Sequence, residues 1–418
     1  MIGSILSLRG RLCMEQQSLF RNPPFIFLFI GSFLAIIGYS MFFMTTTWFV
    51  ISDLGSASLL GIILIAITVP RILMMAFGGV LADKFKKTTI MFSTSSIQGV
   101  LLVILFLMNN ANQLTFVYLI ILGFFFGTLD AFSGPAGTSL IPKIVQKNQI
   151  KQANAVIQGL GQIGFVIGPI ISGSVMEFAG VTTGYLVSAI IVLLSAFFMF
   201  PPFLKEGPVD NTIQQTPLKD FIEGFSYVKA SKFLITGILI LITLNFFAFG
   251  AISIAIPILV ETYGGTPINL SYIDAALGVG MLVSTAIIGM INIRRRGLTS
   301  IAGLIATLIV AIAFSQIPNL YILTALAFLI GFTMTFVSIP FFASAQEDTD
   351  PRIMGRVMSI VFLAMNGFDP LAYASVTLLV SRGFDIQLVI LSFSIVGLII
   401  ALSILWRGKT FRNYKSNY

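Results

Sequence analysis

Long apolar runs dominate the sequence from Phe25 onward and alternate with short polar connectors. Most of these runs have about 20 residues or more, which is the length that a helix needs to cross a hydrocarbon layer of about 30 Å. Because lipid offers no hydrogen-bond partners, the backbone of such a segment must satisfy itself within a helix. A β-barrel would need alternating segments of about ten residues, whereas the stretch from Phe233 to Phe249 is apolar without alternation.

The pattern predicts twelve membrane-spanning helices, arranged six and six. The first six are expected at residues 25–51, 57–82, 88–108, 114–140, 152–177 and 182–204. The other six are expected at residues 233–260, 270–292, 298–316, 319–344, 354–380 and 385–406. The predicted fold class is therefore an all-α membrane protein of two six-helix bundles, residues 25–204 and 233–406.

A polar stretch, residues 205–232, separates the two halves and contains prolines and eight charged residues. Charged side chains are costly in hydrocarbon, so this stretch is expected to lie outside the membrane as a cytoplasmic linker. Its second part, Leu218 to Tyr227, is predicted to form a short amphipathic helix on the membrane surface. Residues 1–24 and 407–418 are expected to be cytoplasmic tails.

The basic residues predict the orientation, because connectors rich in lysine and arginine stay in the cytoplasm. Of the 24 lysines and arginines, 22 fall on the predicted side that holds the linker and both chain ends, Arg382 falls on the other side, and Arg71 lies inside a span. Both termini are thus expected in the cytoplasm. Basic clusters beside anionic headgroups account for the net charge of +8, so membrane lipids are the expected partners and nucleic acid is not.

Composition limits the possible chemistry. The chain is 57% hydrophobic and 10% charged, against roughly 25% charge in soluble domains. It has no histidine and a single cysteine, Cys13, so no internal disulfide, metal site or cofactor is expected. A membrane-embedded enzyme would need a cluster of reactive side chains, and no catalytic residues are apparent. A sensor would need a soluble domain, and the longest polar segment is too short to form one.

The connector after the second predicted span reads GGVLADKFKKTT, residues 78–89. It resembles the loop signature of the major facilitator superfamily, in which a glycine, three residues, an aspartate and a group of bases follow one another. Gly79, Asp83, Lys84 and Lys87 fall on this signature, and Lys86 replaces its second glycine. The resemblance implies a conformational latch in a transporter whose two halves alternate access by rocking.

The fifth predicted span contains GQIGFVIGPIISG, residues 161–173. Its small residues recur at intervals of four or five and place one side of the helix close to another backbone. The run resembles the superfamily's antiporter motif, with Ser172 in place of the first of two paired glycines. The motif residues are Gly164, Gly168, Pro169, Ser172 and Gly173. The resemblance implies export in exchange for protons, while close packing alone would explain the same residues.

Two further segments occupy matching places in the two halves, residues 135–156 and 340–359. Together with residues 261–271, they resemble the branch of the superfamily that holds macrolide-efflux proteins and siderophore exporters. This resemblance implies a bacterial plasma-membrane protein. The second half lacks a working copy of the loop signature, because Ile293 stands where the aspartate is expected.

Charges inside the predicted spans are the sharpest functional candidates, since each costs roughly 2.5–3.5 kcal/mol or more at a helix centre. Three qualify: Arg71, Asp130 and Asp369. Arg71 and Asp130 lie at similar depths in their spans, so they can form an ion pair that is either a static brace or a proton-coupled switch. Asp369 precedes Pro370, so it is either a site for protons or a cationic substrate, or a hydrated helix break.

Aromatic residues crowd the first and seventh predicted spans. In the resembling fold these spans face the central cavity, where aromatic side chains suit amphipathic or cationic molecules, although lipid-facing phenylalanines are common. The candidate cavity residues are Tyr39, Phe42, Phe43, Trp48, Phe246, Phe247 and Phe249.

The combined expectation is a monomeric secondary transporter in the cell membrane that exports amphipathic organic compounds, in the manner of drug or macrolide efflux. Its expected energy source is the proton gradient. The alternatives are proton-coupled import or export of a metabolite or siderophore and, more remotely, a membrane-embedded enzyme or sensor.

Overall fold

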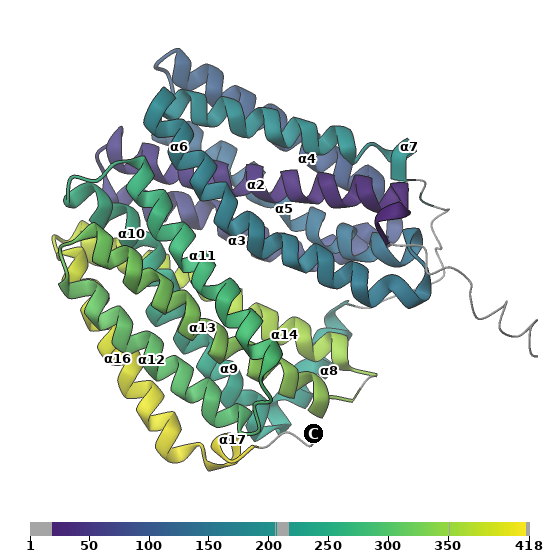
Figure 1. Ribbon diagram of the computed structural model, residues 1–418, viewed down its shortest axis with the longest axis vertical. Coiled ribbons are helices and arrows are strands. Elements are labelled where there is room, and N and C mark those ends of the chain that lie inside the picture. The colour runs from purple at the N-terminus through teal and green to yellow at the C-terminus, as the bar shows by residue number, and fades with distance from the viewer. Residues whose placement is uncertain (1–18, 205, 207–216, 351, 415–418) are drawn as a thin grey trace, which may run out of the picture.

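The computed structural model describes the backbone of residues 19–204, 206, 217–350 and 352–414, with side chains throughout except at residues 76–83 and 217–221. Its regular elements are all helical, and they form two halves (Figure 1). The first half contains η1 (Leu19–Arg21), α2 (Pro23–Ser52), α3 (Ala57–Lys84), α4 (Lys87–Asn110), α5 (Phe116–Ile144), η2 (Lys147–Gln149), α6 (Ile150–Phe198) and α7 (Pro201–Leu204).

The second half begins with the short helix α8 (Pro217–Ala230) and ends with the single turn α17 (Lys409–Arg412). Between them lie α9 (Lys232–Leu244), the π-helical segment η3 (Asn245–Phe249), α10 (Gly250–Thr262), α11 (Pro267–Met290), α12 (Arg296–Gln316), α13 (Leu320–Asp348), α14 (Met354–Asn366), α15 (Asp369–Ser381) and α16 (Ile386–Arg407).

Eleven segments of the described chain are long and apolar enough to cross a membrane, where the hydrophobic pattern predicts twelve. The difference lies in α6, which runs for 49 residues through the two predicted spans 152–177 and 182–204. Within it, Gly180 has φ 79° and ψ 169°, a non-helical conformation that interrupts the helix. Glycine adopts this conformation without a steric penalty. The boundary between the two spans is therefore a single residue with no polar connector.

Two other predicted segments are modified by local breaks. The predicted span 354–380 is divided by Gly367 and Phe368 into α14 and α15, and the span 233–260 contains the π-helical turn η3. The amphipathic helix predicted in the linker is present as α8. It packs against the start of α14, where Glu223 pairs with Arg356 at 2.6 Å.

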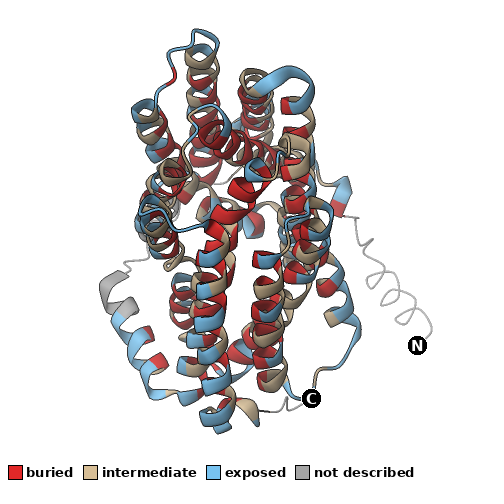
Figure 2. Cartoon of the chain, turned by 90° about the vertical axis from the view of Figure 1, so that its left-hand side faces the viewer, coloured by how far each residue is buried: buried red, intermediate tan, exposed pale blue. Residues whose placement is uncertain are grey.

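The molecule exposes apolar side chains and buries small polar ones. Large exposed residues such as Leu107, Ile309 and Leu402 lie on outward helix faces, while Ser172, Ser188 and Ser195 are fully buried. Figure 2 shows the buried positions running through the middle of the molecule between the helices. This distribution fits helices whose outer surface meets lipid and whose inner surfaces pack closely through small residues.

The two ends of the helices differ, and we call them the linker end and the loop end. The linker end holds α7, α8 and α17, and the loop end holds the connectors at residues 53–56, 111–115, 263–266, 317–319 and 382–385. In Figure 1 the two halves converge at the loop end and diverge toward the linker end.

The seam between the halves is tightly packed at the loop end. A methyl group added to Gly61 of α3 would meet Thr377 and the backbone of Tyr373 in α15, and one added to Gly173 of α6 would meet Ser271 and Pro267. By contrast, a methyl group on Gly134, Gly159, Gly289 or Gly355 would meet no atom within 4 Å. Each of these four glycines lies in the linker-end part of its helix. The contacts of Gly61 and Gly173 therefore close the seam at the loop end, and these four positions have open space beside them.

Candidate functional site

A cavity of about 280 Å³ lies between the two halves. The first half contributes Ile36, Tyr39, Ser40, Phe43, Met44, Thr47, Thr68, Arg71, Gly161, Phe165 and Pro169. The second half contributes Phe249, Ser253, Ile256, Pro257, Leu270, Asp274, Leu277, Asn366, Asp369 and Tyr373. The wall thus combines aromatic and aliphatic side chains with three charged groups, which is the usual composition of a small-molecule site.

Helical spacing explains why these residues share one space. On α2 the lining residues recur every three or four positions, as they do on α6 at Gly161, Phe165 and Pro169. Residues three and four apart lie on the same side of an α-helix. Each helix therefore contributes one stripe to the cavity.

Arg71 and Asp130 form the ion pair that their depths in the spans allowed. The Arg71 Nε lies 2.9 Å from Asp130 Oδ2. One turn away, Gly127 of α5 packs directly against the backbone of Ile67 in α3. Because a glycine at this crossing lets the two backbones approach, the residues one turn further on, Arg71 and Asp130, are brought within pairing distance.

Tyr39 of α2 completes this group. An Arg71 amino group donates to the Tyr39 hydroxyl at 3.4 Å, and the guanidinium carbon lies 5.6 Å from the centre of the Tyr39 ring. Both contacts favour the positive charge of Arg71. The Arg71 side chain, which lines the cavity, is 42% exposed, and that of Asp130 is 25% exposed.

Asp369 is the first residue of α15 and lies in the second half's wall of the cavity. Its position follows from the break at Gly367 and Phe368, where the chain leaves α14 and restarts with Pro370 in the first turn of α15. The Asp369 Oδ1 is buried and has no hydrogen-bond partner among the described residues. Arg71 lines the same cavity from the first half.

Asp274 of α11 also lines the cavity. The sequence analysis missed it, although the criterion that selected Asp369 would have found it, because Asp274 lies within the predicted span 270–292. Leu270, Asp274 and Leu277 form the stripe that α11 presents to the cavity. The site therefore has a carboxylate on each of two second-half helices.

The structure divides the seven predicted aromatic residues between the cavity and the packed interior. Tyr39, Phe43 and Phe249 line the cavity. Phe42 instead packs against Phe126, with ring centres 4.0 Å apart. Phe246 and Phe247 pack against Phe393, and Trp48 belongs to the buried core. These four point to other faces of their helices and are not part of the cavity wall.

The residues of the antiporter-like run are divided between packing and the cavity. Gly164 faces Ile36, Gly168 faces Ser40 and Gly173 faces the start of α11. Ser172 and Thr45 share a buried hydrogen bond of 3.0 Å, and Pro169 lines the cavity. The run therefore joins α6 to both α2 and the second half.

The loop signature falls partly outside the described side chains, which exclude those of Gly79 and Asp83. Lys84 is exposed at the end of α3, whereas Lys87 at the start of α4 is buried. Lys87 Nζ lies 3.9 Å and Lys143 Nζ 3.3 Å from Glu206 Oε1. Glu206 also accepts a hydrogen bond of 3.0 Å from the backbone N–H of Thr88. The signature region is thus fastened to a buried carboxylate at the start of the linker.

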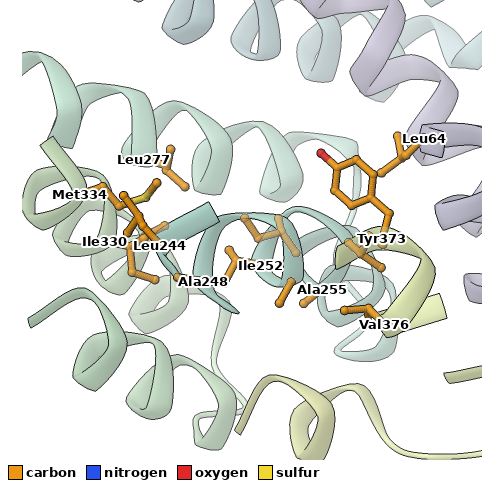
Figure 3. Packing of buried hydrophobic residues seen from close by; sticks show 14 of the residues in the cluster. Leu64, Leu244, Ala248, Ile252, Ala255, Leu277, Ile330, Met334, Tyr373 and Val376 are labelled. Atoms are coloured by element: carbon orange, nitrogen blue, oxygen red, sulfur yellow. The ribbon is translucent and has the colours of Figure 1, made fainter. Parts of the chain in front are cut away.

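Figure 3 shows how the second half packs beside this site. Leu244, Ala248, Ile252 and Ala255 follow one another along the α9–η3–α10 rod, and the Tyr373 ring extends from α15 beside Leu64 of α3. Tyr373 of the second half thus packs against α3 of the first half next to the cavity.

Two bundles of membrane-length helices around a central cavity define the chain as a membrane transporter by class. The sequence profile of the Major Facilitator Superfamily matches residues 28–368, and the chain belongs to this superfamily. It is a transporter and not an enzyme.

The relatives whose names state a function are distant. Macrolide efflux protein A of Streptococcus pyogenes is 24% identical over 318 residues, covering 73% of this chain and 75% of that protein. The staphyloferrin A transporter of Staphylococcus aureus is 24% identical over 383 residues, covering 89% and 92%. Among solved structures, the nucleoside transporter NupG has a TM-score of 0.72 at 16% identity, covering 92% of this chain and 99% of that one. The structural similarity to NupG establishes the fold alone.

Proposed function

We propose that this protein is a secondary active exporter of amphipathic organic compounds that works by proton antiport with alternating access. The single observation that carries the proposal is the cavity between the halves, which is lined from both sides and holds Arg71, Asp274 and Asp369. A site shared by two rigid bundles changes its exposure when the bundles rock against each other.

The cavity wall supports a substrate with both apolar and polar parts. Tyr39, Phe43, Phe165 and Phe249 supply apolar and π surfaces, while the charged groups fix orientation. Macrolide efflux protein A, one of the relatives, is named for the export of such a compound. Efflux of drug-like molecules is therefore the first substrate class to test.

Proton coupling is assigned to the carboxylates. Protonation of Asp130 would remove the charge that holds Arg71, and Asp369 lies where a released Arg71 could act next. A carboxylate that exchanges a proton for a cation links proton movement to the position of a side chain. The alternative role of the Arg71–Asp130 pair is that of a static brace between α3 and α5.

The proposed membrane arrangement has twelve crossings, with the fifth and sixth meeting at Gly180. Both chain ends and the linker lie in the cytoplasm, as the 22 basic residues on that side favour. The protein is proposed to act as a monomer in a bacterial plasma membrane, with the linker end facing the cytoplasm. The loop-end seam is then the closed, outward side.

An alternative substrate is a metabolite or siderophore, moved in either direction. The observation in its favour is the staphyloferrin A transporter, whose match extends over 89% of this chain. Against it stands the cavity wall, where two carboxylates face one arginine that is already paired. A polyanionic siderophore would meet repulsion there.

Everted membrane vesicles test the proposal directly. Energised vesicles that contain the protein are expected to accumulate an amphipathic dye or a macrolide, and collapse of the proton gradient should abolish the uptake. Vesicles from cells carrying Asp130→Asn and Asp369→Asn provide the comparison. Gradient-independent accumulation, or uptake of a nutrient by right-side-out cells with no drug movement, would overturn export by antiport.

A further inference from the structure

We infer that Asp274 and Asp369 form a recognition site for a positively charged group, so the preferred substrate is an amphipathic organic cation. The inference rests on the proposed transport function and narrows its substrate class. It assigns to Asp274 a specificity role that is separate from the Arg71–Asp130 pair.

The first step is the state of the two carboxylates. Among the described residues, no ion pair or hydrogen bond involves the Asp274 side chain. Asp369 Oδ1 is buried without a hydrogen-bond partner. Both groups line the same cavity from different helices, α11 and α15. A buried polar atom such as Asp369 Oδ1 normally has a hydrogen-bond partner, and a bound cationic group between the two carboxylates would supply one.

The second step is the state of the nearby cation. Arg71 is engaged by Asp130 at 2.9 Å and by the Tyr39 hydroxyl at 3.4 Å, both from the first half. Its charge is therefore balanced on its own side of the seam. Asp274 and Asp369 line the same cavity as Arg71, but among the described residues neither carboxylate forms an ion pair with a cation.

The third step is the asymmetry between the halves. Gly331 of α13 packs on the backbone of Leu277 in α11 as Gly127 of α5 packs on Ile67 in α3. Counting one turn onward from this crossing gives Met281 and Met334 in place of Arg71 and Asp130. Counting three residues back from Leu277 gives Asp274, where the first half has the buried Leu64. The second half thus lacks the ion pair and carries an acidic residue of its own.

The fourth step is the remaining wall, which suits the body of such a cation. Phe43 and Phe165 from the first half and Phe249 from the second line the same space, and aromatic faces attract organic cations. The volume of about 280 Å³ is close to the lower bound of about 300 Å³ for pockets that hold drug-sized molecules. A compact cation with aromatic groups therefore fits both the shape and the charge of the cavity.

Equilibrium binding to the purified full-length protein, with no proton gradient, tests the inference. Tetraphenylphosphonium and tetraphenylborate have nearly the same size and shape and opposite charges. The wild-type protein is expected to bind the cation at least tenfold more tightly than the anion. Asp274→Asn should weaken cation binding at least tenfold and narrow this ratio, whereas Asp274→Glu should retain most of it.

The matched control is Asp53→Asn, which removes a carboxylate from the exposed loop-end connector after α2 and should leave binding unchanged. Thermal unfolding of each variant shows whether it is folded, and the wild-type preference for the cation is measurable even if Asp274→Asn does not fold. Equal binding of the two ions, no binding of the cation, or unchanged cation affinity in a folded Asp274→Asn would overturn the inference.

The outcomes also separate this inference from the proposed function. Selective, Asp274-dependent cation binding without gradient-driven efflux would leave the site standing and overturn antiport. Gradient-driven efflux that Asp274→Asn leaves unchanged would leave antiport standing and overturn the recognition site.

Discussion

Among individual side chains, the charged groups inside the membrane-length helices are expected to have the largest effects when they are substituted. The Arg71 side chain is 42% exposed and lines the cavity, and the Asp130 side chain is 25% exposed. Exposed pairs contribute about 1 kcal/mol or less to stability. The effect of breaking this pair should therefore appear in transport before it appears in folding.

Asp130→Asn is predicted to lower gradient-driven transport at least tenfold and to flatten its dependence on pH, because the asparagine cannot release a proton or hold Arg71. Thermal unfolding should shift only slightly, in keeping with a loss of about 1 kcal/mol. Transport assays across a pH series check this. A pH profile identical to that of the wild type would assign the pair a purely structural role.

At the scale of elements, two short features connect long helices. The first is Gly180, whose φ of 79° and ψ of 169° interrupt α6. The second is Glu206, a 1%-exposed carboxylate that joins the start of the linker to Lys143 and Lys87. Neither feature belongs to the cavity, and each fixes how one helix leaves or enters the first half.

Gly180→Ala is predicted to destabilise the protein by about 1–3 kcal/mol, because a side chain strains this backbone conformation. The control is Gly159→Ala on the same helix, where an added methyl group meets no atom within 4 Å and the helix gains propensity. Thermal unfolding in detergent compares the two. Equal stabilities would contradict the interpretation of Gly180 as a required break.

Glu206→Gln is predicted to destabilise the first half by about 3 kcal/mol, because it removes the charge from a buried carboxylate facing two lysines. Glu223→Gln, which affects the half-exposed pair with Arg356, should change stability by about 1 kcal/mol or less. Thermal unfolding and protease cleavage in the linker measure both. A smaller effect for Glu206 than for Glu223 would refute the buried-clamp interpretation.

For the whole molecule, the arrangement of the two halves determines which end of the cavity is closed. The loop-end seam depends on small residues such as Gly61, which packs against Thr377 and the backbone of Tyr373. Any group added there separates the halves at that end.

Gly61→Val is predicted to open the loop end, since overpacking a tight contact costs about 1–3 kcal/mol. In a Cys13→Ser background, a cysteine replacing the cavity residue Ser40 should then react faster with an impermeant thiol reagent added outside cells. Ile62→Phe adds volume to the neighbouring exposed position and should not change the rate. Unchanged labelling in Gly61→Val would contradict the closed seam.

The proposed orientation has its own test. In the same cysteine-free background, a cysteine at Lys229 is expected to be labelled only from the cytoplasmic side, and one at Asn112 only from the outside. The reason is the concentration of lysine and arginine in the connectors of the linker end. Labelling of position 229 from outside the cell would overturn the topology.

The sequence predicted the helices well, because membrane insertion depends on local hydrophobicity and length. The predicted spans agree with the structure except at three places, one of which is the π-helical segment η3 within the span 233–260. Gly180 leaves eleven candidate segments among the described residues, and Gly367 with Phe368 divides a span. The break at Gly180 comes from a single backbone conformation, which a hydropathy pattern does not contain.

The sequence by itself determined an all-helical membrane protein in two halves and selected Arg71, Asp130 and Asp369, since charge in an apolar run is visible along one dimension. Only the tertiary structure decided which helix faces meet. It placed Tyr39 in the cavity and Phe42 in the core, set Glu206 between two lysines, and brought Asp274 to the same space as Asp369. These helices are apolar on the lipid side and on the packed side alike, so no periodicity in the sequence distinguishes the faces.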